Sequence, residues 1–200
     1  MACVMKKMPL LSVTILAAAA MMLIMWAVPQ EVHADTTIEK LWVGDSEEVT
    51  SDGVIGDTGA TKGSATVKAT DDGIVLTLEN FEYAGQGHSV SIRGVAATAA
   101  IHYDGSKKLT IELIGDNLIE GTAADTAGIK IGHHDLTVTG PGSLKVISGP
   151  GQNNWSQGIV GGDGDNYPVT LTVENCKLEV IAKDSALMSI GIYGFNHLDV

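Results

Sequence analysis

One polar loop carries residue types that are common in sugar-binding sites. Trp155 lies within Gly151-Gln152-Asn153-Asn154-Trp155-Ser156-Gln157, whereas a tryptophan of the hydrophobic core would normally lie in a strand. Exposed aromatic rings together with amide groups make up many sugar-binding faces. We therefore expect Trp155, Asn153 and Asn154 to contribute to a carbohydrate-binding site. The alternative is an indole that folds back over the neighbouring strands.

A second loop carries oxygen ligands that suit a cation. Asp163, Asp165 and Asn166 lie among glycines in residues 161–166. Calcium binds about six to eight oxygens, and alternating acidic and amide residues between glycines can wrap around it. The loop lacks the distal glutamate of an EF-hand and does not follow a nonapeptide calcium repeat. It is a candidate Ca2+ site, with an ordinary acidic surface turn as the alternative.

Residues that would support catalysis are sparse. Arg93 is the only arginine in the chain and is distant in sequence from the acidic loop. A polysaccharide lyase would combine calcium with a base that removes the α-proton, and a glycosidase would need two carboxylates at a set separation. The adjacent His133 and His134 would point to opposite faces of a strand. We expect no enzymatic activity, with a calcium-dependent polysaccharide lyase as the alternative.

The N-terminal segment predicts export. Lys6 and Lys7 precede an uncharged, mostly apolar run over residues 8–30, and Val32-His33-Ala34 follows it with small residues where a signal peptidase reads. This pattern predicts a signal peptide over residues 1–34, cleaved before Asp35, and a secreted, extracellular or cell-surface protein with no membrane segment after cleavage. A retained anchor is the alternative, because the apolar run approaches the roughly 20 residues of a spanning helix.

Charge and cysteine content narrow the partners and the sources of stability. Two of the 12 basic and one of the 24 acidic residues lie in the first 34, so residues 35–200 carry a net charge of −13. Such an acidic surface repels nucleic acid and anionic lipid. Cys176 is the one cysteine of this part, so packing rather than an intramolecular disulfide must stabilise it.

Short alternating segments predict that the part after residue 34 is all-β. Apolar and polar residues alternate with a period of two in several runs bounded by Gly, Asn or Asp, and no helical period of apolar residues occurs there. The clearest runs are 74–78, 109–113, 136–138 and 169–173.

Repetition makes the architecture more specific. A Leu-Thr-hydrophobic triplet begins at residues 76, 109, 136 and 171, with a variant at 198. A second element recurs as Asn117-Leu118-Ile119, Ser143-Leu144-Lys145-Val146 and Lys177-Leu178-Glu179-Val180, and a third recurs as Gly-Ile at 128, 158 and 191. Three short strands in each unit of about 30 residues predict a right-handed parallel β-helix, a solenoid whose stacked coils share one core. A β-sandwich is the alternative.

The repeat also relates the aromatic residues to one another. Tyr193 and Phe195 lie near the position of Trp155 but one coil later, so the three are expected to line one side of the helix. Trp42 lies near the start of the domain, where we expect it to plug the open end of the first coil.

Two boundaries follow from the same pattern. Residues 35–72 are acidic and turn-rich, which fits an N-terminal cap with first strands, and residues 73–200 carry the β-helix repeats. The chain ends on Leu198-Asp199-Val200, which resembles the first strand of another coil. We therefore expect truncation at the C-terminus and further coils in the same parent chain.

Several phrases resemble a family of secreted bacterial repeat proteins. The phrases are Leu41-Trp42-Val43-Gly44, Gly63-Ser64-Ala65-Thr66-Val67, Gly115-Asp116-Asn117, Leu136-Thr137-Val138-Thr139-Gly140 and Gly142-Ser143-Leu144. Over residues 38–200 they are similar to the calcium-containing parallel β-helix proteins of Gram-positive bacteria described as carbohydrate-binding domains. The resemblance implies binding of cellulose or of acidic, pectin-like plant polysaccharide.

Together these features favour a secreted or surface-displayed, non-catalytic polysaccharide-binding β-helix, assisted by calcium. The alternative of another class is a structural or adhesin spacer within a larger cell-surface protein.

Overall fold

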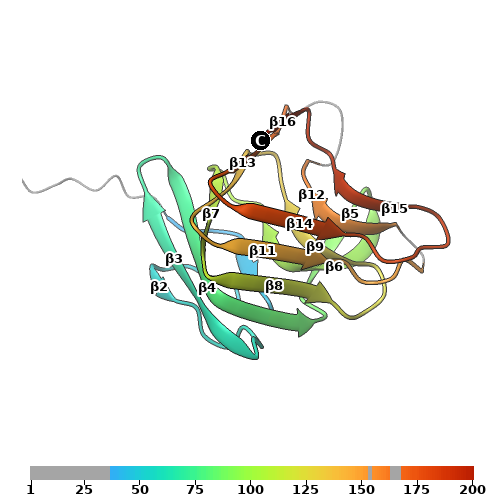
Figure 1. Ribbon diagram of the computed structural model, residues 1–200, viewed down its shortest axis with the longest axis horizontal. Coiled ribbons are helices and arrows are strands. Elements are labelled where there is room, and N and C mark those ends of the chain that lie inside the picture. Colours follow the sequence, from blue (N-terminus) through green and yellow to red (C-terminus); the bar gives the residue numbers. More distant parts are fainter. Residues whose placement is uncertain (1–36, 153–154, 163–167) are drawn as a thin grey trace, which may run out of the picture. The chain divides into compact units, whose positions relative to one another are not determined.

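The computed structural model describes residues 37–152, 155–162 and 168–200, and these residues form an all-β fold without a helix (Figure 1). The prediction of an all-β chain is confirmed. None of the described residues belongs to a helix long and apolar enough to cross a membrane.

The strands form two sheets in which successive repeats pair in parallel (Figure 1). Sheet B contains a first series of paired strands: β4 (Gly73–Gly85), β7 (Leu109–Ile114), β10 (Leu136–Thr139), β13 (Thr170–Glu174) and β16 (His197–Asp199). The end of β4 also pairs with a second series: β8 (Asp116–Gly121), β11 (Ser143–Ile147) and β14 (Lys177–Ile181). Sheet A contains the third series: β6 (Val95–Tyr103), β9 (Thr126–Ile131), β12 (Ser156–Val160) and β15 (Ser189–Tyr193).

This pairing has the pattern of a solenoid. Each described strand of a series bonds to its counterpart in the next repeat, as the recurring three-part phrase predicted, and the pairing within all three series is parallel. A β-sandwich of the immunoglobulin type would pair its strands antiparallel. The pairing therefore favours the β-helix over that alternative.

The first repeat begins two residues earlier than the sequence pattern indicated. The register aligns Ile74 with Leu109, then Leu136, Leu171 and Leu198, so the spacings are 35, 27, 35 and 27 residues. The prediction that the first triplet begins at Leu76, in register with Leu109, was wrong. A shift of two residues keeps every side chain on the same face of a strand, so the alternating run 74–78 fits both registers and only the pairing decides between them.

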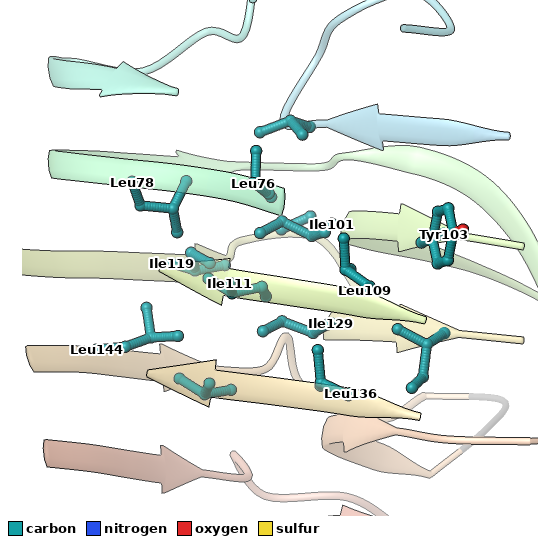
Figure 2. Close-up of a cluster of buried hydrophobic side chains, with 14 of the residues drawn as sticks. Leu76, Leu78, Ile101, Tyr103, Leu109, Ile111, Ile119, Ile129, Leu136 and Leu144 are labelled. Carbon is teal, nitrogen blue, oxygen red and sulfur yellow. The ribbon is translucent and has the colours of Figure 1, made fainter. Parts of the chain in front are cut away.

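The core lies between the three series. Fully buried leucine and isoleucine side chains from each series meet there, and burying each stabilises the fold by about 1.5–3 kcal/mol. Figure 2 labels ten of the core side chains: Leu76, Leu78, Ile101, Tyr103, Leu109, Ile111, Ile119, Ile129, Leu136 and Leu144.

The recurring Gly-Ile phrase has a packing reason. A Cβ on Gly128 would overlap Cγ1 of Val146, and one on Gly158 would overlap Cγ1 of Val180. Glycine therefore lets the third series approach the second closely enough for their isoleucines and valines to share one core.

Antiparallel strands pair with the strands of the first repeat. β3 (Lys62–Thr70) pairs with β4, β2 (Gly53–Val54) pairs with β3, and β1 (Leu41–Val43) pairs with β6. Leu41 and Val43 are buried in the core, so the residue between them, Trp42, points outward and is half-buried. The prediction that Trp42 plugs the coil was wrong, because the alternation of β1 assigns the inward positions to its neighbours.

The other end of the described fold leaves apolar side chains in solvent. β14, β15 and β16 are the last strands of their series in the described residues, and Leu198 is 56% exposed there.

Candidate functional site

The candidate site lies on the outer face of sheet A, which points away from the main core. Side chains at matched register form one row across its strands: Trp42, His102, Lys130, Val160 and Tyr193. Ala99 and its register partner Ala127 also face outward, because both belong to the smaller apolar cluster and not to the main core. Gln157 holds the equivalent position on β12, two residues before Ile159 as Ala127 is two residues before its partner Ile129.

A hairpin covers the middle of this face. β5 (His88–Ile92) runs antiparallel to the start of β6, and Arg93 and Gly94 form the two-residue turn between them with φ of 54° and 78°. Two positive φ angles are those of a type I′ turn, whose twist matches that of the strands. A small apolar cluster with Val90 and Tyr193 at its margin packs the hairpin on sheet A: Ile92, Ala97, Ala99, Ala127 and Val160.

The tip of the hairpin reaches two aromatic rings from different coils. Trp155 and Tyr193 meet edge to face, with ring centroids 5.8 Å apart and planes at 87°. The guanidinium carbon of Arg93 lies 5.1 Å from the centroid of Trp155 and 4.7 Å from that of Tyr193. We name these three residues the Trp155 cluster. An aromatic pair of this geometry stabilises by about 0.5–1.5 kcal/mol and an exposed cation–π contact by about 0.5–1 kcal/mol.

Hydrogen bonds hold the segment before β12 in place. The N–H of Gln152 donates to Oδ1 of Asp125 at 2.7 Å, and Gly151 forms a parallel bridge with Ser185 of the next coil. On the other side of Trp155, the N–H of Ser156 donates to the carbonyl of Met188 in the next repeat at 3.0 Å. The backbone on both sides of the tryptophan is thus tied to neighbouring repeats.

Gln157 is a buried polar residue near this cluster in the sequence. It follows Trp155 by two residues on β12, which ends at Val160, the register partner of Tyr193. Gln157 is 1% exposed. Neither atom of its side-chain amide has a hydrogen-bond partner among the residues that the structure describes.

The structure brings together only part of the predicted aromatic site. Tyr193 contacts Trp155, but Phe195 packs against the main core. Gly194 lies between them with φ of 80°, and this left-handed residue turns the chain so that Phe195 leaves the outer face. The expectation that Phe195 lines the same side as Trp155 was therefore wrong.

The remaining predicted ligands lie outside the described residues. These are Asn153 and Asn154 beside the tryptophan and Asp163, Asp165 and Asn166 of the proposed calcium loop. Within residues 37–152, 155–162 and 168–200, no group of three or more His, Cys, Asp or Glu side chains is arranged to hold a metal. His133 and His134 border a shallow polar hollow with Asp104.

A second aromatic cluster lies on the same sheet. Trp42 stacks on His88 and His102, with ring centroids 4.3 and 4.9 Å away and planes within 12° of parallel. We name these three residues the Trp42 cluster. Burial lowers the pKa of His88 below its usual value because it disfavours the imidazolium, while the charges of Glu47 and Glu48 oppose this shift.

Sequence reasoning missed Arg93 and Gln157. Arg93 is far in sequence from the other candidate residues, and no local pattern shows that its hairpin folds across sheet A. Gln157 does lie in the polar segment around Trp155, so its neighbourhood was visible in the sequence but its burial was not.

Comparisons with protein-family models, with curated proteins and with solved structures found no match for this chain. The geometry of the outer face of sheet A is therefore the basis for assigning a function.

Proposed function

We propose that this protein is a secreted or surface-displayed β-helix that binds polysaccharide without cleaving it. Its coils wind as a right-handed parallel β-helix, and the ligand binds at the Trp155 cluster. The observation that carries the proposal is the contact of Trp155 with Tyr193 under the guanidinium of Arg93.

The chemistry of this cluster suits a sugar. The half-buried indole of Trp155 offers a planar apolar surface for the C–H groups of a pyranose, and Tyr193 and Arg93 add hydrogen-bonding groups around it. The three side chains come from the segment before β12, from β15 and from the turn after β5, and the paired strands hold these segments in place. A pre-organised site of this kind loses little conformational entropy when it binds.

Calcium assistance is part of the proposal. Asp163, Asp165 and Asn166 follow directly after β12, on the same repeat as Trp155. Their carboxylate and amide oxygens are of the type that Ca2+ prefers. All three residues lie outside the part of the chain that the structure describes.

The test is binding of the purified protein to a panel of insoluble and soluble polysaccharides, neutral and acidic, with calcium and with a chelator. Trp155→Ala should weaken binding by about 10- to 100-fold, the loss typical of a central aromatic anchor. Trp42→Ala is the matched control, because it removes the same side chain from the same face of sheet A at a distance from the site.

Two results would decide against the proposal. Equal binding by the wild type and Trp155→Ala would move the site elsewhere. An absence of binding to every polysaccharide in both conditions would favour a structural spacer of the cell surface.

A further inference from the structure

Arg93 stands out within the Trp155 cluster because of its charge. It is the only arginine of a chain that has 24 acidic residues, yet none of the carboxylates in the described ranges forms an ion pair with it. Its guanidinium instead contacts the rings of Trp155 and Tyr193. Among the described residues, Arg93 is therefore a cation without a counter-charge.

The guanidinium is accessible to a ligand that arrives from solvent. Arg93 is exposed at the two-residue turn after β5, and the side chains of Trp155 and Tyr193 are each half-buried. A guanidinium carries five N–H donors that fan out in one plane, so donors stay available at its edge while it lies against aromatic rings.

The position of this cation distinguishes ligands by charge. A sugar ring that contacts Trp155 or Tyr193 comes close to the guanidinium, whose carbon lies 5.1 and 4.7 Å from the two ring centroids. A carboxylate or a sulfate accepts two parallel N–H bonds from a guanidinium, and charge-assisted bonds of this kind are about twice as strong as neutral ones. A single hydroxyl oxygen cannot accept such a fork. An oxyanion on the sugar therefore gains more from Arg93 than a hydroxyl does.

The charge of the remaining chain makes this contact selective. Residues 35–200 hold 10 basic and 23 acidic residues, a net charge of −13, so an anionic ligand is repelled where no cation meets it. At physiological salt, charges at the surface act over about 8 Å. The guanidinium at the cluster, and not the distant carboxylates, therefore decides whether an anionic sugar unit is accepted there.

From these observations we propose that Arg93 is a specificity-determining residue: it pairs with an oxyanion of the ligand, a carboxylate or a sulfate ester, and favours sugar units that carry one over neutral units. This inference rests on the proposed function and names the residue that selects among its ligands. Both oxyanions present the same kind of acceptor to a guanidinium, so the ligands of the test distinguish them.

The test compares ligands that differ only in charge, with the wild type and Arg93→Gln at one fixed calcium concentration. Oligogalacturonates are compared with their methyl esters, and a sulfated glucan oligosaccharide with its unsulfated parent. The wild type should bind the charged member of at least one pair about 10-fold more tightly, and Arg93→Gln should lose this preference. Glutamine keeps an NH2 donor for hydroxyls, so the affinity for the neutral member should change by less than about 2-fold.

Two further variants separate selectivity from net charge and from folding. Lys68→Gln removes the same charge from an exposed position of β3 and should leave the preference unchanged. Arg93→Lys keeps the charge but not the planar fork, so it should retain part of the preference. Damage to the fold would weaken the binding of both members of a pair alike, so the ratio of the two affinities reports on the contact itself.

The outcomes that contradict the inference differ from those that contradict the proposed function. An unchanged ratio in Arg93→Gln, an equal loss of preference in Lys68→Gln, or a wild type that binds both members of each pair equally well overturns the role of Arg93 and leaves the proposed function standing. If the wild type binds no polysaccharide or oligosaccharide at all, both proposals fail.

Discussion

The outer face of sheet A carries two aromatic clusters that are built in different ways. In the Trp42 cluster, Trp42 and His102 are direct partners in the register of β1 and β6, and His88 comes from the strand that pairs beside them. In the Trp155 cluster, the rings come from two coils and the cation from a hairpin turn. The Trp42 cluster therefore follows from the pairing of neighbouring strands. The Trp155 cluster requires in addition that a loop and a hairpin turn meet on the same face.

This difference suggests different roles. The rings of the Trp42 cluster stack face to face on neighbouring strands, as cross-strand pairs that stabilise a sheet do. The Trp155 cluster joins a loop, a strand and a hairpin turn that are not direct partners in a ladder, so sheet pairing does not require it. We infer that the Trp42 cluster is structural and that the Trp155 cluster binds ligand.

The largest expected effect separates the two tryptophans by stability. Trp42→Ala should lower the free energy of unfolding by about 1–3 kcal/mol, because a half-buried indole loses its contacts with two imidazoles. Trp155→Ala should lower it by less, about 1 kcal/mol, because this indole lies outside a strand and meets Tyr193 only edge to face. Denaturant unfolding of both variants measures this, and a larger loss for Trp155→Ala would reverse the assignment of roles.

A smaller effect concerns the hairpin. Arg93→Gln should lower the free energy of unfolding by about 0.5–1 kcal/mol, because the cation–π contacts with Trp155 and Tyr193 are lost. Hydrogen exchange of the amides in β5 should become faster, while exchange in β7 stays the same. Lys68→Gln removes the same charge from an exposed position of β3 and should change neither region. Unaltered exchange in β5 would show that Arg93 does not hold the hairpin.

The smallest effect is a pH dependence of the Trp42 cluster. Burial lowers the pKa of His88, so below the ordinary histidine pKa of about 6.5 the unfolded chain binds this proton more readily than the folded one. The contribution of neutral His88 is therefore complete above about pH 6.5 and declines as the pH falls below it. Melting temperatures at pH 7 and 5 should differ less for His88→Phe than for the wild type. An equal difference would mean that His88 does not titrate in the unfolding transition.

The inward-facing residues of the strands could be predicted from the sequence, because a local pattern of apolar residues specifies them. Apolar residues recur with a period of two in strands such as β7, β10 and β11, and the recurring Gly-Ile phrase aligns Ile129 with Ile159 in the structure. The error of two residues at Ile74 shows the limit of this pattern, since alternation fixes the face of a strand but not its partner.

Contacts on the outer face could be predicted only between residues at equivalent positions of two repeats. Trp155 and Tyr193 were associated because they lie one coil apart, and the structure places them in contact. The prediction for Phe195 was wrong because Gly194, which has a left-handed φ, turns the chain so that Phe195 leaves the outer face. Arg93 depends on the path of a hairpin across a sheet formed by later residues, and no local period encodes that long-range contact.

The most direct test of the account uses the tryptophans as reporters. Trp26, Trp42 and Trp155 are the three in the sequence. With Trp26 and Trp42 changed to Phe, only Trp155 emits, and titration with the polysaccharide that binds best should change its fluorescence with a saturable curve. With Trp26 and Trp155 changed to Phe, only Trp42 emits, and the same titration should leave the spectrum unchanged. A saturable change reported by Trp42 but not by Trp155 would contradict the account.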